Sequence, residues 1–133
     1  MNIVLDDADA IVEPTLHDSQ LISINVIEAK NLSLNFLLVN KKIITLTLRN
    51  VILLNVIDFS IGNIVLDVTV SKIENKSDEY ISTGIKRAIN HPNYLISDEY
   101  ISNLKNKGGN LLFCLSPSYG AEIYCVCEGI EIS

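Results

Sequence analysis

At 133 residues, 48% of them hydrophobic, the chain is long enough for one domain with a sizeable core. Its formal net charge is −6, with 16 acidic against 10 basic residues, which is the opposite of the balance in a nucleic-acid-binding protein. No apolar run approaches the ~20 residues of a membrane-spanning helix, and the acidic N-terminus lacks the basic region of a secretory signal. We therefore expect a cytoplasmic protein without nucleic-acid or membrane partners. The acidic surface either keeps the domain soluble or suits a basic protein partner.

The first third of the chain alternates apolar and polar residues in short segments. Residues 1–15 read as a lead-in with one apolar piece, Ile3–Leu5. Residues 21–27 alternate and predict a strand with one core face. After a turn at 30–31, a strand over 32–39 places four apolar side chains in phase: Leu32, Leu34, Phe36 and Leu38.

The clearest strand pattern spans residues 43–49, after a turn at 40–42. Ile44, Leu46 and Leu48 share one face, and threonines on the other face suit a half-exposed sheet. Residues 51–57 are apolar without clean alternation, and they predict either a separate buried strand or a continuation of the previous strand through a bulge. A connection containing Gly62 leads to a strand over 64–70 with four apolar side chains in phase: Ile64, Leu66, Val68 and Val70.

The hexapeptide Ser-Asp-Glu-Tyr-Ile-Ser occurs at 77–82 and again at 97–102. Each copy predicts a helix start, because the serine can accept from the N–H groups of the first turn and the acids complement the helix dipole. His91-Pro92 should end the first helix and Gly108-Gly109 the second. The repeat reflects either helix-start chemistry arising twice or a recognition surface. Helical spacing predicts the buried faces: Tyr80 or Ile81, Ile85, and Ala88 or Ile89 in the first helix, and Ile101 and Leu104 in the second.

Two apolar segments near the C-terminus predict a hairpin. They are Leu111–Leu115 and Ala121–Cys127, joined by a polar break at 116–120 that contains Pro and Gly. Both segments are apolar on both faces, which indicates a place where the sheet is covered on both sides. A turn centred near Ser118 would put Cys114 opposite Glu122.

These elements predict a single mainly-β or α+β domain over 1–133. The expected architecture is an antiparallel sheet, either a sandwich or a half-barrel, of about six or seven strands with two short helices inserted before a C-terminal hairpin. The parts are the lead-in, antiparallel strands over 16–72, a helical insertion over 76–108 and a closing hairpin over 110–132.

Few residues suggest chemistry. The three cysteines are odd in number, and Cys125 and Cys127 are about 6.5–7 Å apart on one strand, so we expect free thiols. Zinc bound through those two cysteines is the alternative, but it lacks a second close pair of ligands. His17-Asp18 has the residue types of a general base with its orienting acid, whereas an Asp at a strand entrance more commonly makes a turn. We expect no enzyme activity, no cofactor and no metal.

Three stretches together resemble one family. Leu16–Ile24 has the form HD-x-x-L-x-x-I, Leu46–Val51 resembles a central strand that ends in a small polar residue and valine, and Ser118–Cys125 contains a Ser-Tyr-Gly turn. This pattern is similar to immunity proteins of bacterial polymorphic-toxin and contact-dependent inhibition systems. The resemblance covers about residues 16–70 and 111–132 and leaves the helical insertion without an equivalent.

The resemblance implies a non-enzymatic cytoplasmic protein that binds and neutralises a cognate toxin domain, which we expect to be basic and nuclease-like. Acids and tyrosines of the helical insertion are the expected partner-binding residues, since tyrosines are common interface anchors; the residues are Asp78, Glu79, Tyr80, Tyr94, Asp98, Glu99 and Tyr100. A small-molecule or lipid-binding β domain with a cavity between sheet and helices is the alternative. Self-association as a homodimer through an exposed strand edge stays open.

Overall fold

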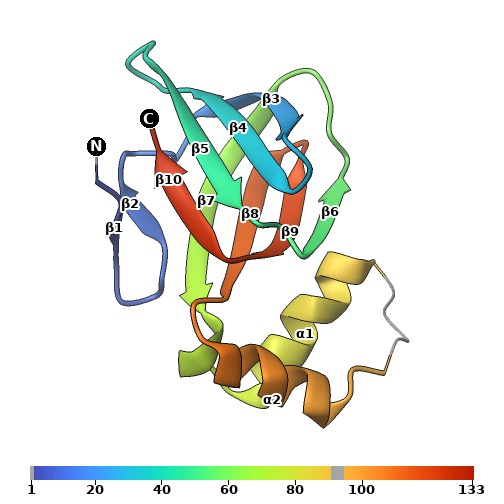
Figure 1. The fold of residues 1–133 in the computed structure, drawn as a ribbon. Coiled ribbons are helices and arrows are strands. Elements are labelled where there is room, and N and C mark those ends of the chain that lie inside the picture. Colours follow the sequence, from blue (N-terminus) through green and yellow to red (C-terminus); the bar gives the residue numbers. More distant parts are fainter. Residues whose placement is uncertain (1, 91–94) are drawn as a thin grey trace.

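The computed structural model describes residues 2–90 and 95–133, and within them it is mainly β with two α-helices between β7 and β8 (Figure 1). The elements are β1 (Val4–Leu5), β2 (Ile11–Glu13), β3 (Gln20–Ile27), β4 (Asn31–Leu37), β5 (Ile43–Arg49), β6 (Leu53–Ile57), β7 (Asn63–Lys72), a 3-10 turn (Ile73–Asn75), α1 (Asp78–Ile89), α2 (Asp98–Lys107), β8 (Leu111–Tyr119), β9 (Glu122–Cys127) and β10 (Gly129–Ile132). The expected fold class is confirmed. The main sheet has eight strands, and β1 and β2 form a separate pair.

The main sheet is open, antiparallel throughout and strongly curled (Figure 1). Its order is β10-β5-β4-β3-β7-β8-β9-β6. Strand β5 continues into β6 through residues 50–52, and β9 continues into β10 through Glu128. These two bent segments pair with each other twice, β5 with β10 and β6 with β9, so the chain crosses between the two sides of the sheet while β10 and β6 remain its edge strands.

The interior of the curled sheet holds the main core. The alternation in β4 and β5 is confirmed, because every second side chain of each strand is buried there, including Leu34, Phe36, Leu46 and Leu48 at 0% exposure. On β8 and β9, the inward residues are Phe113, Leu115, Ile123, Cys125 and Cys127. Burying a large apolar side chain is worth about 1.5–3 kcal/mol, so these strands supply much of the stability.

β-Bulges, one in β3 and two in β7, correct the expected faces of these strands. In β7, bulges around Val65 shift the phase, so that Val65 and Val68 are buried and Leu66 is 44% exposed. In β3, a bulge after Leu21 separates this buried residue from the rest of the strand, and Val26 is 74% exposed. A bulge adds one residue to one strand and moves every later side chain to the other face, which alternation alone does not reveal.

The C-terminal hairpin is longer than expected and its register is different. Strand β8 runs to Tyr119, so the turn lies at Gly120 and Ala121 rather than near Ser118. Cys114 therefore pairs with Tyr124, not Glu122. Residues 129–132 leave the hairpin and pair with β5. Residues 53–57 form a strand of their own, β6, which pairs with β9, but none of its residues is fully buried, so the expectation of a buried strand is corrected.

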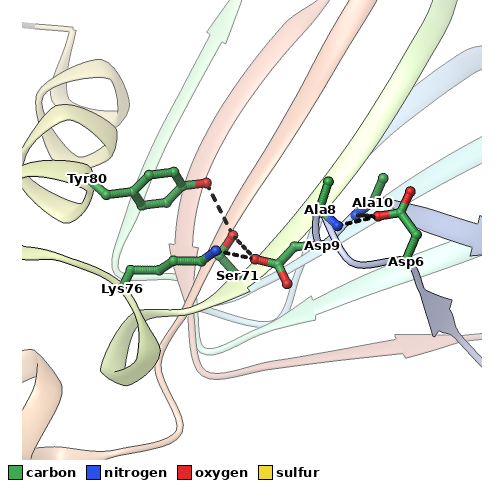
Figure 2. A network of polar contacts seen from close by, with 7 residues as sticks. All are labelled: Asp6, Ala8, Asp9, Ala10, Ser71, Lys76 and Tyr80. Carbon is green, nitrogen blue, oxygen red and sulfur yellow. Dashed lines mark hydrogen bonds and ion pairs between the residues drawn. The ribbon is translucent and has the colours of Figure 1, made fainter.

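The lead-in is not featureless, because β1 and β2 pair and the loop between them reaches β7. Figure 2 shows how this loop is fixed: the Asp9 carboxylate accepts from Ser71 Oγ at 3.0 Å and pairs with Lys76 Nζ at 2.7 Å. The hydrogen bond from Lys76 holds the pKa of Asp9 below its usual value. Tyr80 extends the network, with its hydroxyl 3.3 Å from Ser71 Oγ. One polar cluster thus ties the N-terminal loop, the end of β7 and the start of α1.

Both helix starts and both buried helix faces are confirmed. Ser77 Oγ accepts from Tyr80 N and Ser97 Oγ accepts from Tyr100 N, each at 3.1 Å. The helices are placed together at one end of the sheet (Figure 1), where their apolar faces cover outward residues of β8 and β9. This second core confirms that the hairpin is covered on both sides, and it contains Ile73, Ile81, Ile85, Ile101, Leu104, Leu112 and Val126.

Candidate binding sites

The structure separates the acidic residues expected to bind a partner. Lys105, at the end of α2, pairs with Asp78, at the start of α1, at 2.5 Å. The two helices therefore run in opposite directions, and the first turn of α2 lies at the far end of the pair. Asp78 is engaged in this ion pair between the helices, whereas Glu79 is exposed and has no such pair in the described chain.

Of the other residues expected to bind a partner, one takes part in a structural hydrogen-bond network, and the others that the structure describes lie at the surface. Tyr80 is 44% exposed, and its hydroxyl takes part in the network at the start of α1. Tyr100 is 37% exposed and lines a hollow of about 330 Å³ with Leu53 and Ile89. Asp98 and Glu99 are exposed beside it on the first turn of α2. Tyr94 lies outside the described residues.

A groove runs between α1 and the uncovered part of the outer sheet face. It consists of two adjoining hollows of about 380 and 360 Å³, which share Thr83, Arg87 and Tyr124. The first hollow extends along α1 to Glu79 and over Cys114 of β8. The second extends over β6 and the end of α1, and its further lining is Asn55, Ile57, Lys86, Asn90 and Glu122. Hollows of this size suit small ligands.

Arg87 stands where the two hollows meet. Its guanidinium lies 5.6 Å from the centroid of the Tyr124 ring, within the range of a cation–π contact. Asn55 Nδ2 donates to the Arg87 carbonyl oxygen at 2.8 Å and fixes this turn of α1 to β6. Arg87 is exposed, and in the described part of the chain it has no carboxylate within ion-pair distance, which is also true of the neighbouring Lys86.

Tyr124 forms the floor of the groove and is only 8% exposed. Its hydroxyl donates to the Glu122 carboxylate. Burial, together with this hydrogen bond, raises the pKa of Tyr124 to about 12. The phenol therefore stays neutral at physiological pH, and it presents an apolar ring to the groove while its polar end is satisfied within the protein.

A second surface lies at the opposite end of β7 from the helices. Phe59 and Tyr119 line one shallow hollow there and are 48% and 63% exposed. Ile61, on the same loop as Phe59, is 98% exposed. We call Phe59, Ile61 and Tyr119 the end patch. Exposed apolar side chains are ordinary when they are single, but a group of large ones is typical of an interaction site.

One buried side chain, that of Asn63, holds the end patch in place. Asn63 is 2% exposed, and its Oδ1 accepts from Ser60 N at 2.8 Å and Ala121 N at 3.0 Å. Its Nδ2 donates to Ser60 O at 2.7 Å and Leu21 O at 3.2 Å. Asn63 thus connects the loop before β7, the turn after β8 and the start of β3. The sequence pattern does not reveal this role of Asn63, and its place beside Gly62 at a strand start is the only signal of it.

His17 and Asp18 meet, but on an open surface. His17 Nδ1 is 3.2 Å from Asp18 Oδ2, and the side chains are 59% and 63% exposed. The turn is closed by Ser19, whose Oγ donates to Leu16 O at 2.5 Å. Asp18 N also donates to Val65 O at 2.9 Å, so this stretch anchors β3 to the bulge in β7. That position suits a fold-forming role.

The three cysteines are free thiols. Cys125 and Cys127 are buried in the core, where their mutual hydrogen bond and burial raise the pKa of Cys125. Burial also raises the pKa of Cys114, which contributes to the groove. Across residues 2–90 and 95–133, no group of three or more His, Cys, Asp or Glu side chains is placed to hold a metal ion.

Comparison of the chain with protein-family models, curated proteins and solved structures finds no match. Among the described helices, none is both long and apolar enough to cross a membrane. The fold and its surfaces define the chain only as a curled antiparallel β domain that carries a helical pair.

Proposed function

We propose that the chain is a non-enzymatic cytoplasmic immunity protein that binds and neutralises a cognate bacterial toxin domain. The end patch is the observation that supports this proposal most directly. It presents three large side chains on a loop and turn that Asn63 holds in one conformation. A pre-ordered patch loses little conformational entropy when it binds a partner.

The charge of the chain indicates the kind of partner. The net charge is −6, and four of the ten basic residues are already paired with acids inside the structure. Opposite charge on a partner speeds encounter and disfavours wrong partners. We therefore propose a basic, nuclease-type toxin domain, which an affinity pull-down from the native host with mass spectrometry would identify. Recovery of the tagged chain without a protein partner would count against the immunity proposal.

Ile61→Asp is the variant that tests the end patch. Because Ile61 is 98% exposed, the substitution should leave the melting temperature unchanged. We expect it to weaken binding of the captured partner at least tenfold, since it places a charge within an apolar contact. Val39→Asp, at a 65% exposed position in the turn between β4 and β5, is the matched control. Equal affinities of the two variants and the wild type would remove the end patch from the interface.

The helical acids form a separate test. The double variant Glu79→Lys/Glu99→Lys leaves the Asp78–Lys105 pair intact and should slow association several-fold at low salt, with less effect at high salt. Asp7→Lys/Glu13→Lys changes the net charge equally at exposed positions of the N-terminal hairpin. If the two double variants slow association equally, the helical acids act only through net charge and are not contacts.

A small-molecule or lipid-binding domain is the second proposed function, and the groove between α1 and the sheet favours it. Its two hollows lie between sheet and helices, have an aromatic floor and are open to solvent. Native mass spectrometry of the purified protein would test this function through a retained ligand. A homodimer through a free strand edge stays a further proposal, which sedimentation would test.

A further inference from the structure

Resting on the second proposed function, we propose that the groove beside α1 binds a small amphipathic carboxylate. The carboxylate pairs with Arg87, and the apolar part of the ligand lies in the hollow over β6, against Ile57. Arg87 is the basic residue that lines both hollows, and in the described chain its guanidinium is not paired with a carboxylate. A guanidinium presents paired N–H donors that match the two oxygens of a carboxylate.

Arg87 is held in a suitable position for this contact. Its backbone is fixed by Asn55 and its guanidinium lies over the Tyr124 ring. A side chain that is already ordered loses less entropy when it binds a ligand.

Two acidic residues line the groove, Glu79 and Glu122, and their positions determine where the carboxylate of the ligand can lie. Glu79 is eight residues from Arg87 on α1, about 12 Å along the helix axis. A carboxylate at Arg87 is therefore remote from Glu79. Glu122 is nearer, since it lines the same hollow as Arg87, but its carboxylate accepts a hydrogen bond from Tyr124. It should weaken binding of an anion and exclude ligands with several negative charges.

The apolar part of the ligand fits the hollow over β6. Ile57 and the Tyr124 ring provide its apolar surface, and Asn55 and Asn90 stand at its border. A hollow of about 360 Å³ accommodates a chain of several carbons or one aromatic ring. Lys86 lines this hollow as well and adds a second positive charge on the side of Arg87. The charges thus favour a ligand with one carboxylate and an uncharged body.

Octanoate and 1-octanol are the probes that test the assignment, with affinities from calorimetry and the contact surface from NMR chemical shifts. Octanoate should bind at least tenfold more tightly than 1-octanol and shift signals of α1, β6 and β9. Arg87→Gln should remove this preference by weakening octanoate binding at least tenfold, whereas Glu122→Gln should strengthen octanoate binding several-fold. Lys41→Gln, in the β4–β5 turn, makes the same charge change outside the groove and should have no effect.

Each other outcome has a distinct meaning. Equal binding of both probes, unaffected by Arg87→Gln, would retain a ligand-binding groove and overturn the carboxylate assignment. Tighter binding of octyl phosphate than of octanoate would also overturn it, in favour of a phosphate head group. Binding of none of the probes at millimolar concentration would overturn both this inference and the second proposed function.

Discussion

Asn63→Ala should lower the free energy of unfolding by about 2–4 kcal/mol, because it removes four hydrogen bonds from a site that is 2% exposed. Two backbone N–H groups, those of Ser60 and Ala121, would lose their acceptor. The loop that carries Phe59 and Ile61 should become mobile even where the rest of the fold survives. Urea unfolding measures the loss in stability, and hydrogen exchange at Ala121 measures the local opening.

Asn110→Ala is the matched control for this variant. Asn110 is equally buried at 2%, but its side chain makes one hydrogen bond, from Nδ2 to Leu104 O at 3.0 Å. Its Oδ1 has no hydrogen-bond partner in the described structure. We therefore expect Asn110→Ala to cost about 1 kcal/mol. If the two variants were equally destabilised, burial rather than the hydrogen-bond network would explain the effect at Asn63.

Gly120→Ala should also destabilise the protein strongly, by about 2–4 kcal/mol. Gly120 has φ +84°, a conformation that L side chains rarely adopt, and an added Cβ would lie 2.5 Å from Asn63 Oδ1 and 3.1 Å from Asn63 Cα. The methyl group would press against the residue that holds the end patch. Thermal and urea unfolding should both show the loss, and partner binding should weaken with it.

Gly62→Ala separates the two causes of this loss. Gly62 has nearly the same φ, +87°, but nothing lies within 4 Å of its added Cβ. It should therefore show only the backbone cost, about 1 kcal/mol. The difference between the two glycine variants measures the contact with Asn63. It should shrink in the Asn63→Ala background, because the clashing oxygen is then absent; an unchanged difference would contradict this explanation.

The strands and helices were largely predictable because local rules governed them. In β4 and β5 the alternation is uninterrupted, so the burial of Phe36 and Leu46 followed directly from the pattern. The Ser caps of both helices are local interactions three residues long. The buried face of β7 was not predictable. The bulges near Val65 depend on backbone hydrogen bonds between Val65 and the segment at Asp18 and Ser19, which is distant in sequence.

The candidate sites depend on contacts between distant segments and were only partly foreseen. The identical acidic turns at Ser77 and Ser97 suggested one surface, but the antiparallel helices place them at opposite ends of the pair. The sequence gives no sign of the role of Arg87, because the residue that it contacts, Tyr124, lies on another element, β9. Asn63 resembled an ordinary turn residue, since its partners at Leu21 and Ala121 are 42 and 58 positions away.

The two bent segments that pair with each other have a consequence for folding during synthesis. Arg49 of β5 and Glu131 of β10 are 82 positions apart in sequence, yet they form an ion pair across adjacent strands. At roughly 5–20 residues per second, translation leaves β5 without this neighbour for about 4–16 s. Until then β5 has a free edge, and free edges invite pairing with other chains. The nascent chain therefore passes through an interval in which β5 is open to pairing with other chains, and pairing with β10 ends it.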